Sequence, residues 1–302
     1  MSWFRSAFLL ILTNILVVTT IMVLISVTGV QGYLYHFGID PLSMMVLCSV
    51  IGFGGAFASL LMSRWIAKTM GGVQVLDPEN PGGQEEKWLL DTVYGLARKA
   101  GLETMPEVGI YQSPDPNAFA TGPGRDSALV AVSTGLFTAM DRNQIEAVLG
   151  HEMTHITNGD MVTLTLIQGV VNSFVFFLAW TLSIILTRSN DDRRGSNYMA
   201  QYFLRNMLQM VFGLLGMIVV MWFSRWREYR ADAGGARLTS RHRMADSLRA
   251  LQKYIDRPKP AEPAALAAFK ISAPGGSLFA SHPPLAQRIA RLESSSEVIS
   301  ED

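Results

Sequence analysis

The residues with the clearest chemistry are two histidines and a glutamate in the run His151-Glu152-Met153-Thr154-His155. Residues four apart on a helix lie one turn apart, so the imidazoles of His151 and His155 can bind one metal ion. Glu152 lies about 100° further round the helix, near the metal but outside its ligand set. This arrangement suits a general base acting on water. The alternative is a surface helix with solvated side chains.

A zinc site that activates water needs a third protein ligand and an open fourth position. The candidate is Glu228, in the run Arg227-Glu228-Tyr229-Arg230-Ala231-Asp232. Glu228 and Asp232 are four apart and face the same way on a helix, so one can bind metal while the other orients a ligand imidazole. The alternative is a surface pair that balances neighbouring arginines. Two histidines and a glutamate favour zinc, although another divalent ion stays possible.

The helix that carries the histidines has a clear start. Asp141 is the expected N-cap, and Gln144 completes a capping box. Apolar residues spaced for one buried face follow it, namely Ile145, Val148, Leu149 and Ile156. A second helix, residues 225–237, is expected to carry Glu228.

Composition indicates a membrane protein. Hydrophobic residues make up 49% of the 302 residues and charged residues only 17%, against about 25% in soluble domains. Net charge is zero, which argues against a nucleic-acid-binding or disordered chain, and one Cys excludes a disulfide scaffold. Uncharged stretches long enough for transmembrane helices occur at about 7–30, 41–63, 161–187 and 206–224.

The four predicted spans divide the chain into membrane segments (1–63 and 161–224) and a domain outside the membrane in two parts (64–160 and 225–302). Lys and Arg placement puts both termini and this domain in the cytoplasm. The loop 188–205 is the exception, because it carries several arginines although it should lie outside. Two crossings between His155 and Glu228 return the chain to the same membrane face, so these residues can meet.

The predicted domain outside the membrane mixes helices and strands. A Gly/Pro-rich linker at 71–83 leads into a helix. Three short strands then form a predicted small antiparallel sheet. The expected strands are 107–112, 118–121 and 127–133, and the expected further helices are 85–100, 240–256 and 283–293.

These motifs, with four spans in this order, resemble the HtpX family of bacterial membrane zinc metalloproteases. The similarity extends to Asn117-Ala118-Phe119-Ala120-Thr121-Gly122 and to Ser281-His282-Pro283-Pro284 with Arg288. It implies a mainly α membrane protein with four transmembrane helices and a cytoplasmic zincin-like α+β metalloprotease domain.

The resemblance also implies roles for individual residues. His151, His155 and Glu228 would bind one Zn²⁺ per chain, with Glu152 as general base and Asp232 orienting His151. Asn117, Ala118, Phe119 and Ala120 would form a strand to which substrate adds. His282 and Arg288 would close the site and stabilise the oxyanion. From the sequence alone, His282 could equally precede a helix and Arg288 could be a surface charge.

The expected function is a zinc metalloendopeptidase of the bacterial inner membrane that cleaves unfolded or damaged membrane proteins at the cytoplasmic face under stress. No G-x-x-x-x-G-K-[ST] motif occurs, so no nucleotide or ATP motor is expected. Three alternatives remain. They are an intramembrane protease, a transporter or zinc-regulated binding protein supported only by Gln168, Asn172 and the loop 188–205, and a prenyl-CAAX-processing enzyme.

Overall fold

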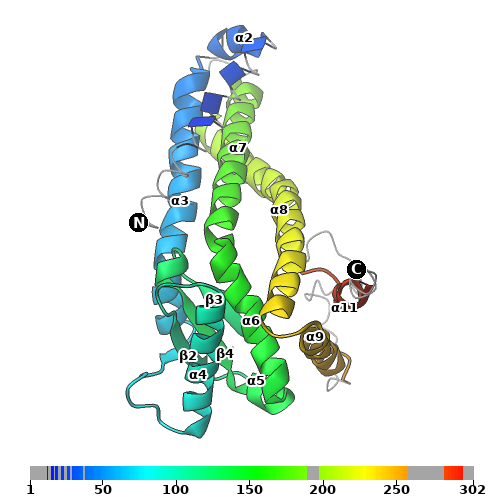
Figure 1. Ribbon diagram of the computed structural model, residues 1–302. Coiled ribbons are helices and arrows are strands. Elements are labelled where there is room, and N and C mark those ends of the chain that lie inside the picture. Colours follow the sequence, from blue (N-terminus) through cyan, green and yellow to red (C-terminus); the bar gives the residue numbers. More distant parts are fainter. Residues whose placement is uncertain are drawn as a thin grey trace, which may run out of the picture. The chain divides into compact units, whose positions relative to one another are not determined.

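The computed structural model describes residues 29–36, 38–188, 197–257 and 282–294, together with scattered residues between 12 and 27. The chain divides into two compact units. Unit 1 comprises Met1–Leu61 and Val162–Val220, and unit 2 comprises Met62–Met161 and Met221–Asp302. Figure 1 labels their helices and strands.

Long apolar helices build unit 1. Three described helices are long and apolar enough to span a membrane, namely α3 (Pro41–Thr69), α7 (Asp160–Arg188) and α8 (Asn197–Leu238). Each of them has one end in unit 2. They contain the runs 41–63, 161–187 and 206–224 that the sequence predicts as spans. A short helix, α2 (Val30–His36), precedes them. The predicted span at 7–30 lies outside the described residues except for scattered positions, so four spans stay a prediction.

Glycines allow close contact between the helices of unit 1. A Cβ atom added at Gly52 of α3 would lie 2.8 Å from the backbone nitrogen of Ser173 in α7. One added at Gly216 of α8 would lie 2.5 Å from the side chain of Val171 in α7. Both separations are too short for a carbon contact, so the three helices pack here through small residues, as membrane helices commonly do.

The sheet of unit 2 has four strands in the order β1-β2-β4-β3. They are β1 (Gln74–Val75), β2 (Glu107–Tyr111), β3 (Ala118–Thr121) and β4 (Leu129–Ser133). β2 and β4 run parallel, while the other two pairs are antiparallel. The predicted antiparallel sheet is therefore wrong, and the predicted linker at 71–83 contains an edge strand.

Burial explains this strand order. β4 is buried at every position, so it takes the interior place between β2 and β3. Its alternate residues face opposite ways. Val130 and Val132 belong to the main core, while Leu129 and Ala131 pack with Ala67 from the end of α3. A sheet covered on both faces needs a largely apolar central strand, and β4, apolar from Leu129 to Val132, meets that need.

Helices complete unit 2. They are α4 (Gln84–Lys99), the single 3₁₀ turn η1 (Arg125–Ser127), α5 (Thr134–Ala139), α6 (Arg142–Asn158), α9 (Arg241–Ile255) and α11 (Leu285–Ser294). The sequence predicts α4, α6, α9 and α11 to within a few residues, but it does not predict α5. The main core contains buried side chains from α4, the sheet, α5 and α6.

The ends of α6 follow from local chemistry. The Asp141 side chain accepts hydrogen bonds from the backbone N–H groups of Asn143 and Gln144, and the Gln144 side chain accepts one from the Asp141 N–H. The predicted capping box is thus confirmed. At the other end, Gly159 adopts a left-handed conformation with φ of 69°, which glycine enters without steric cost. The chain then continues directly into α7.

Candidate active site

Three potential metal ligands converge from two helices of unit 2. The Nε2 atoms of His151 and His155, one turn apart on α6, lie 3.2 Å from each other. Glu228 comes from α8. Its Oε2 atom is 3.4 Å from His151 Nε2, and its Oε1 atom is 3.4 Å from His155 Nε2. One carboxylate therefore faces both imidazoles.

These spacings fit a tetrahedral metal site. Ligand atoms about 2.0–2.2 Å from a zinc ion at the corners of a tetrahedron lie about 3.3–3.6 Å from each other. The observed separations of 3.2–3.4 Å lie within or just below that range, although His151 and His155 face different oxygens of Glu228. One ligand atom from each of the three residues lies within 4.8 Å of the others. Oε2 of Glu228 is also buried and makes no hydrogen bond of acceptable angle within the described residues. A buried, poorly satisfied carboxylate oxygen beside two imidazoles is well suited to bind a cation.

Electrostatics keep Glu228 ionised. Its side chain is only 1% exposed, and burial would raise its pKa. The contacts with His151, His155 and His282 outweigh burial and hold the pKa of Glu228 far below its usual range. Burial would likewise lower the pKa of His151, but its contacts with Asp232 and Glu228 raise that pKa to about 9. Metal binding at these ligands therefore displaces protons.

Each histidine has a carboxylate partner on its other ring nitrogen. His151 Nδ1 is 3.0 Å from Asp232 Oδ1, the pair that the sequence resemblance implies. His155 Nδ1 is 2.6 Å from Asp160 Oδ2. Sequence reasoning missed Asp160, which lies just beyond the left-handed turn at Gly159. A signal was available, because a carboxylate at the first position of an apolar membrane helix needs a partner.

Arg288 is tied to Asp232. Its Nε and Nη2 atoms donate hydrogen bonds of 2.8 and 2.6 Å to the two carboxylate oxygens of Asp232, and its Nη1 atom lies 3.4 Å from Glu228 Oε2. The residue is only 5% exposed. The alternative of a surface charge is therefore wrong for Arg288.

His282 lies at the rim of the same group. Its side chain is 63% exposed, and its Nδ1 atom is 2.8 Å from Glu228 Oε2. It precedes α11, which begins three residues later at Leu285. His282 therefore contacts a candidate metal ligand while most of its side chain faces solvent.

Glu152 faces the sheet. Its Oε2 atom accepts a 3.0 Å hydrogen bond from the backbone N–H of Ala120 in β3. The opposite edge of β3 pairs with β4, and the Asn117 carbonyl accepts from Ser133 N–H on that side. Hydrogen-bonding direction alternates along a strand, so the peptide groups of Ala118 and Ala120 face the open edge. The sequence did not predict the contact between Glu152 and this edge.

A cleft of about 410 Å³ joins these groups. His151, Glu152, Glu228, His282 and Arg288 line it, together with Asn117 and Ala118 of the strand region. Apolar side chains cover the rest of its wall, namely Leu136, Met140, Val148, Met244, Leu248, Leu251 and Ile255. The polar groups and an apolar wall thus border one cavity beside an open strand edge.

Two imidazoles, a carboxylate and a further glutamate in such a cleft define a metallopeptidase site, here in a chain with membrane-length helices. Residues 83–296 match peptidase family M48. The chain is 48% identical to the "Protease HtpX homolog" of Bacillus subtilis, over 96% of this chain and 99% of that protein. It is 44% identical to the "Protease HtpX" of Yersinia enterocolitica, over 95% and 97% respectively.

A solved structure has a similar fold. The crystal structure of S. mikatae Ste24p matches 94% of this chain and 66% of that longer chain, with a TM-score of 0.58 and 19% identity. This chain therefore belongs to peptidase family M48 and resembles the HtpX proteases along nearly its whole length. It is a membrane metalloprotease, and the family predicted from the sequence is confirmed.

Proposed function

We propose that this chain is a zinc-dependent endopeptidase whose metal is bound by His151, His155 and Glu228. The observation that carries the proposal is the separation of 3.2–3.4 Å among these three ligand groups, close to the edge length of a zinc tetrahedron. Zinc bound there supplies Lewis acidity that lowers the pKa of a coordinated water to about 7. Asp232 and Asp160 orient the two imidazoles through their Nδ1 atoms.

Glu152 acts as the general base and acid. It takes a proton from the attacking water and delivers it to the leaving amine. The hydrogen bond from Ala120 N–H holds its carboxylate beside the open edge of β3, where a scissile peptide would lie. His282 stabilises the oxyanion, a role supported by its exposure and its contact with Glu228. Arg288 acts through Asp232 as a positioning residue, because its donors are already used there.

Substrate binds as an added strand. The outward peptide group of Ala118 and the carbonyl of Ala120 offer main-chain hydrogen bonds, which discriminate little between sequences. The neighbouring residues Asn117 and Phe119 direct their peptide groups toward β4 and maintain the strand. A substrate must therefore present an extended segment, which a folded domain does not.

The apolar wall of the cleft gives the enzyme its side-chain preference. Met140, Met244 and Leu251 are among the residues that line it, and burial of a large apolar side chain there contributes about 1.5–3 kcal/mol. Extended segments rich in apolar residues are typical of unfolded membrane proteins. We infer that such proteins are the substrates and that cleavage is a quality-control and stress response.

The proposed location is the bacterial inner membrane, with the active site and both termini in the cytoplasm. Lys and Arg placement supports this orientation. The chain carries no nucleotide-binding loop motif, so hydrolysis proceeds without ATP. Substrates are then limited to segments that are already unfolded near the membrane surface.

The test is the substitution Glu152→Gln in the purified full-length protein. We expect wild-type zinc content and a fall in casein cleavage of about 10²–10⁴-fold, the usual contribution of general acid–base catalysis. Glu146→Gln is the matched control on the same helix, since Glu146 contacts Arg243 at 2.7 Å and lies outside the cleft. Cleavage by Glu152→Gln at the wild-type rate would refute the assignment of the base.

A further inference from the structure

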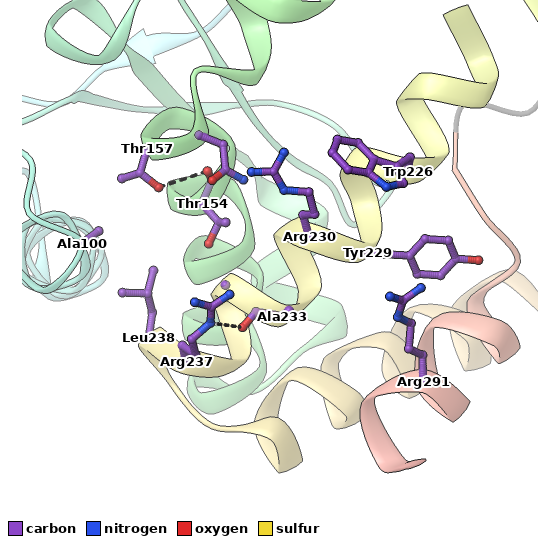
Figure 2. A pocket seen from close by; sticks show the side chains of 12 residues that line it. Ala100, Thr154, Thr157, Trp226, Tyr229, Arg230, Ala233, Arg237, Leu238 and Arg291 are labelled. Carbon is purple, nitrogen blue, oxygen red and sulfur yellow. Dashed lines mark hydrogen bonds between the residues drawn. The ribbon is translucent and has the colours of Figure 1, made fainter. Parts of the chain in front are cut away.

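A second cavity lies between α6 and α8, away from the candidate metal ligands. It has a volume of about 660 Å³. We call it the arginine cavity and define it by Thr154 and Thr157 of α6 and by Trp226, Arg230 and Arg237 of α8. Figure 2 shows both arginines projecting from α8 into the space beside the two threonines. At about 100° per residue, this side of α8 is roughly opposite to Glu228.

The lining of the arginine cavity is rich in arginine. It includes a third arginine, Arg291 of α11, and an amide, Asn158, but no Asp or Glu. In the part of the chain that the structure describes, Arg230 and Arg237 form no ion pair. Arg237 donates one hydrogen bond of 3.3 Å to the Ala233 carbonyl. Such a cavity attracts an anion.

Aromatic stacking holds one guanidinium ready to bind. The Cζ atom of Arg230 lies 4.8 Å from the centre of the Trp226 ring. Stacking occupies the flat face of a guanidinium, whereas its N–H donors point outward in the plane of the group. Arg230 can therefore keep its contact with Trp226 and still make two parallel hydrogen bonds to a phosphate.

The cavity begins at the level of the lipid headgroups. Trp226 and Arg230 lie two and six residues beyond Ser224, where the apolar run of α8 ends. At about 1.5 Å per residue they are about 3 and 9 Å past that end. The headgroup layer is about 5–8 Å thick on each side of the apolar core. On α6, Asn158 lies two residues before Asp160, where the membrane helix α7 begins. Asn158 of α6 and Trp226 of α8 thus lie in the headgroup layer and Arg230 lies at its outer edge, whereas Arg237, 13 residues beyond Ser224, lies about 20 Å past that end.

We propose that the arginine cavity binds the phosphate group of an anionic phospholipid headgroup. Arg230 would bind the phosphodiester, the threonine hydroxyls and Asn158 would contact the remaining headgroup oxygens, and Arg237, further from the membrane, would add positive charge to the cavity. Basic pockets at the cytoplasmic ends of membrane helices are suited to such headgroups, and tryptophan is enriched at that depth. A soluble phosphate compound offers the same chemistry, so the test must separate the two sources.

A bound headgroup would join the two helices that carry the candidate metal ligands. Those helices touch beside the cavity, since a Cβ atom added at Gly234 of α8 would lie 2.2 Å from Thr154 Cγ2 of α6. A ligand that contacts both walls therefore stabilises their packing. The expected signs are lipid retention and a higher melting temperature with anionic lipid than with zwitterionic lipid.

The experiment uses the full-length protein in neutral detergent, with phosphatidylglycerol or phosphatidylcholine added and bound lipid counted by native mass spectrometry. We expect Arg230→Gln/Arg237→Gln to weaken phosphatidylglycerol binding at least about tenfold, because charge-assisted hydrogen bonds are lost. Arg225→Gln is the control for Arg230→Gln. It removes one charge from the same end of the apolar run but lies outside the cavity lining. We expect it to stay within about twofold of wild type, as surface substitutions usually do.

Three outcomes would overturn the proposal. Equal losses for Arg225→Gln and Arg230→Gln would mean general attraction to a charged surface. Unchanged binding in the double variant would mean that lipid binds elsewhere. Inorganic phosphate or glycerol 3-phosphate, titrated in the same assay, should compete only weakly. Competition as strong as that of the lipid would assign the cavity to a soluble phosphate compound. Equal melting temperatures of all variants in phosphatidylcholine would show that they are folded.

Discussion

The contact between Asp160 and His155 leads to a quantitative prediction. Asp160 is only 4% exposed, and its carboxylate lies 2.6 Å from His155 Nδ1, a short separation typical of a charge-assisted hydrogen bond. Loss of such a partner typically weakens metal binding by about 10–100-fold, which corresponds to about 1.4–2.7 kcal/mol. Asp160→Asn keeps an acceptor oxygen, so we expect a loss near tenfold. Asp160→Ala keeps none, so we expect a loss near a hundredfold.

The assay is competition for zinc between the purified full-length protein and a chelator of known affinity. Asp246→Asn is a matched control, because Asp246 also contacts an imidazole nitrogen, His242 Nδ1, at 2.8 Å. That histidine is 82% exposed, and neither His242 nor Asp246 lines the cleft, so zinc affinity should not change. Zinc affinities within twofold of wild type for both Asp160 variants would refute the reasoning.

Three further substitutions and one control substitution test the frame of the site by urea unfolding of the metal-free protein. Arg288→Gln leaves Asp232 buried without its partner and should cost about 3–5 kcal/mol; a cost below about 1 kcal/mol, typical of exposed ion pairs, would contradict this. Gly235→Ala brings a Cβ to 2.9 Å from the α6 backbone and should cost about 1–3 kcal/mol. Gly213→Ala meets open space and should be neutral or stabilising by about 1 kcal/mol. Asp141→Ala removes the capping box and should cost about 1 kcal/mol; unchanged stability would show that the cap is dispensable.

Local signals predicted the helices of this protein, whereas the sheet depended on non-local ones. The capping box at Asp141 and the apolar spacing that follows lie within one turn or two, so the start of α6 was predictable. Strand pairing depends on which strand is most completely buried. β4 is buried at every position, and it therefore lies between β2 and β3. A pattern of three short strands in the sequence does not show which strand will take the central position. The predicted antiparallel arrangement was therefore wrong.

In the candidate site, too, some contacts were predictable from the sequence and others were not. The spacing of His151 and His155 on one helix predicted that their imidazoles converge. The number of intervening spans predicted that Glu228 can join them. Sequence reasoning missed the partner of His155 because their contact depends on the left-handed turn at Gly159. That turn places the Asp160 carboxylate beside His155 Nδ1. The burial of Arg288 was also unavailable from the sequence, since a charged residue in an amphipathic helix is usually exposed.

The most direct test of the zinc site is the metal content of Glu228→Gln, measured together with casein cleavage. The substitution keeps the shape of the side chain but removes the charge that faces both imidazoles. We predict about one zinc ion per chain in the wild type and in Glu146→Gln, and loss of both zinc and cleavage in Glu228→Gln. A Glu228→Gln protein that binds zinc with wild-type affinity and cleaves casein at the wild-type rate would contradict the account.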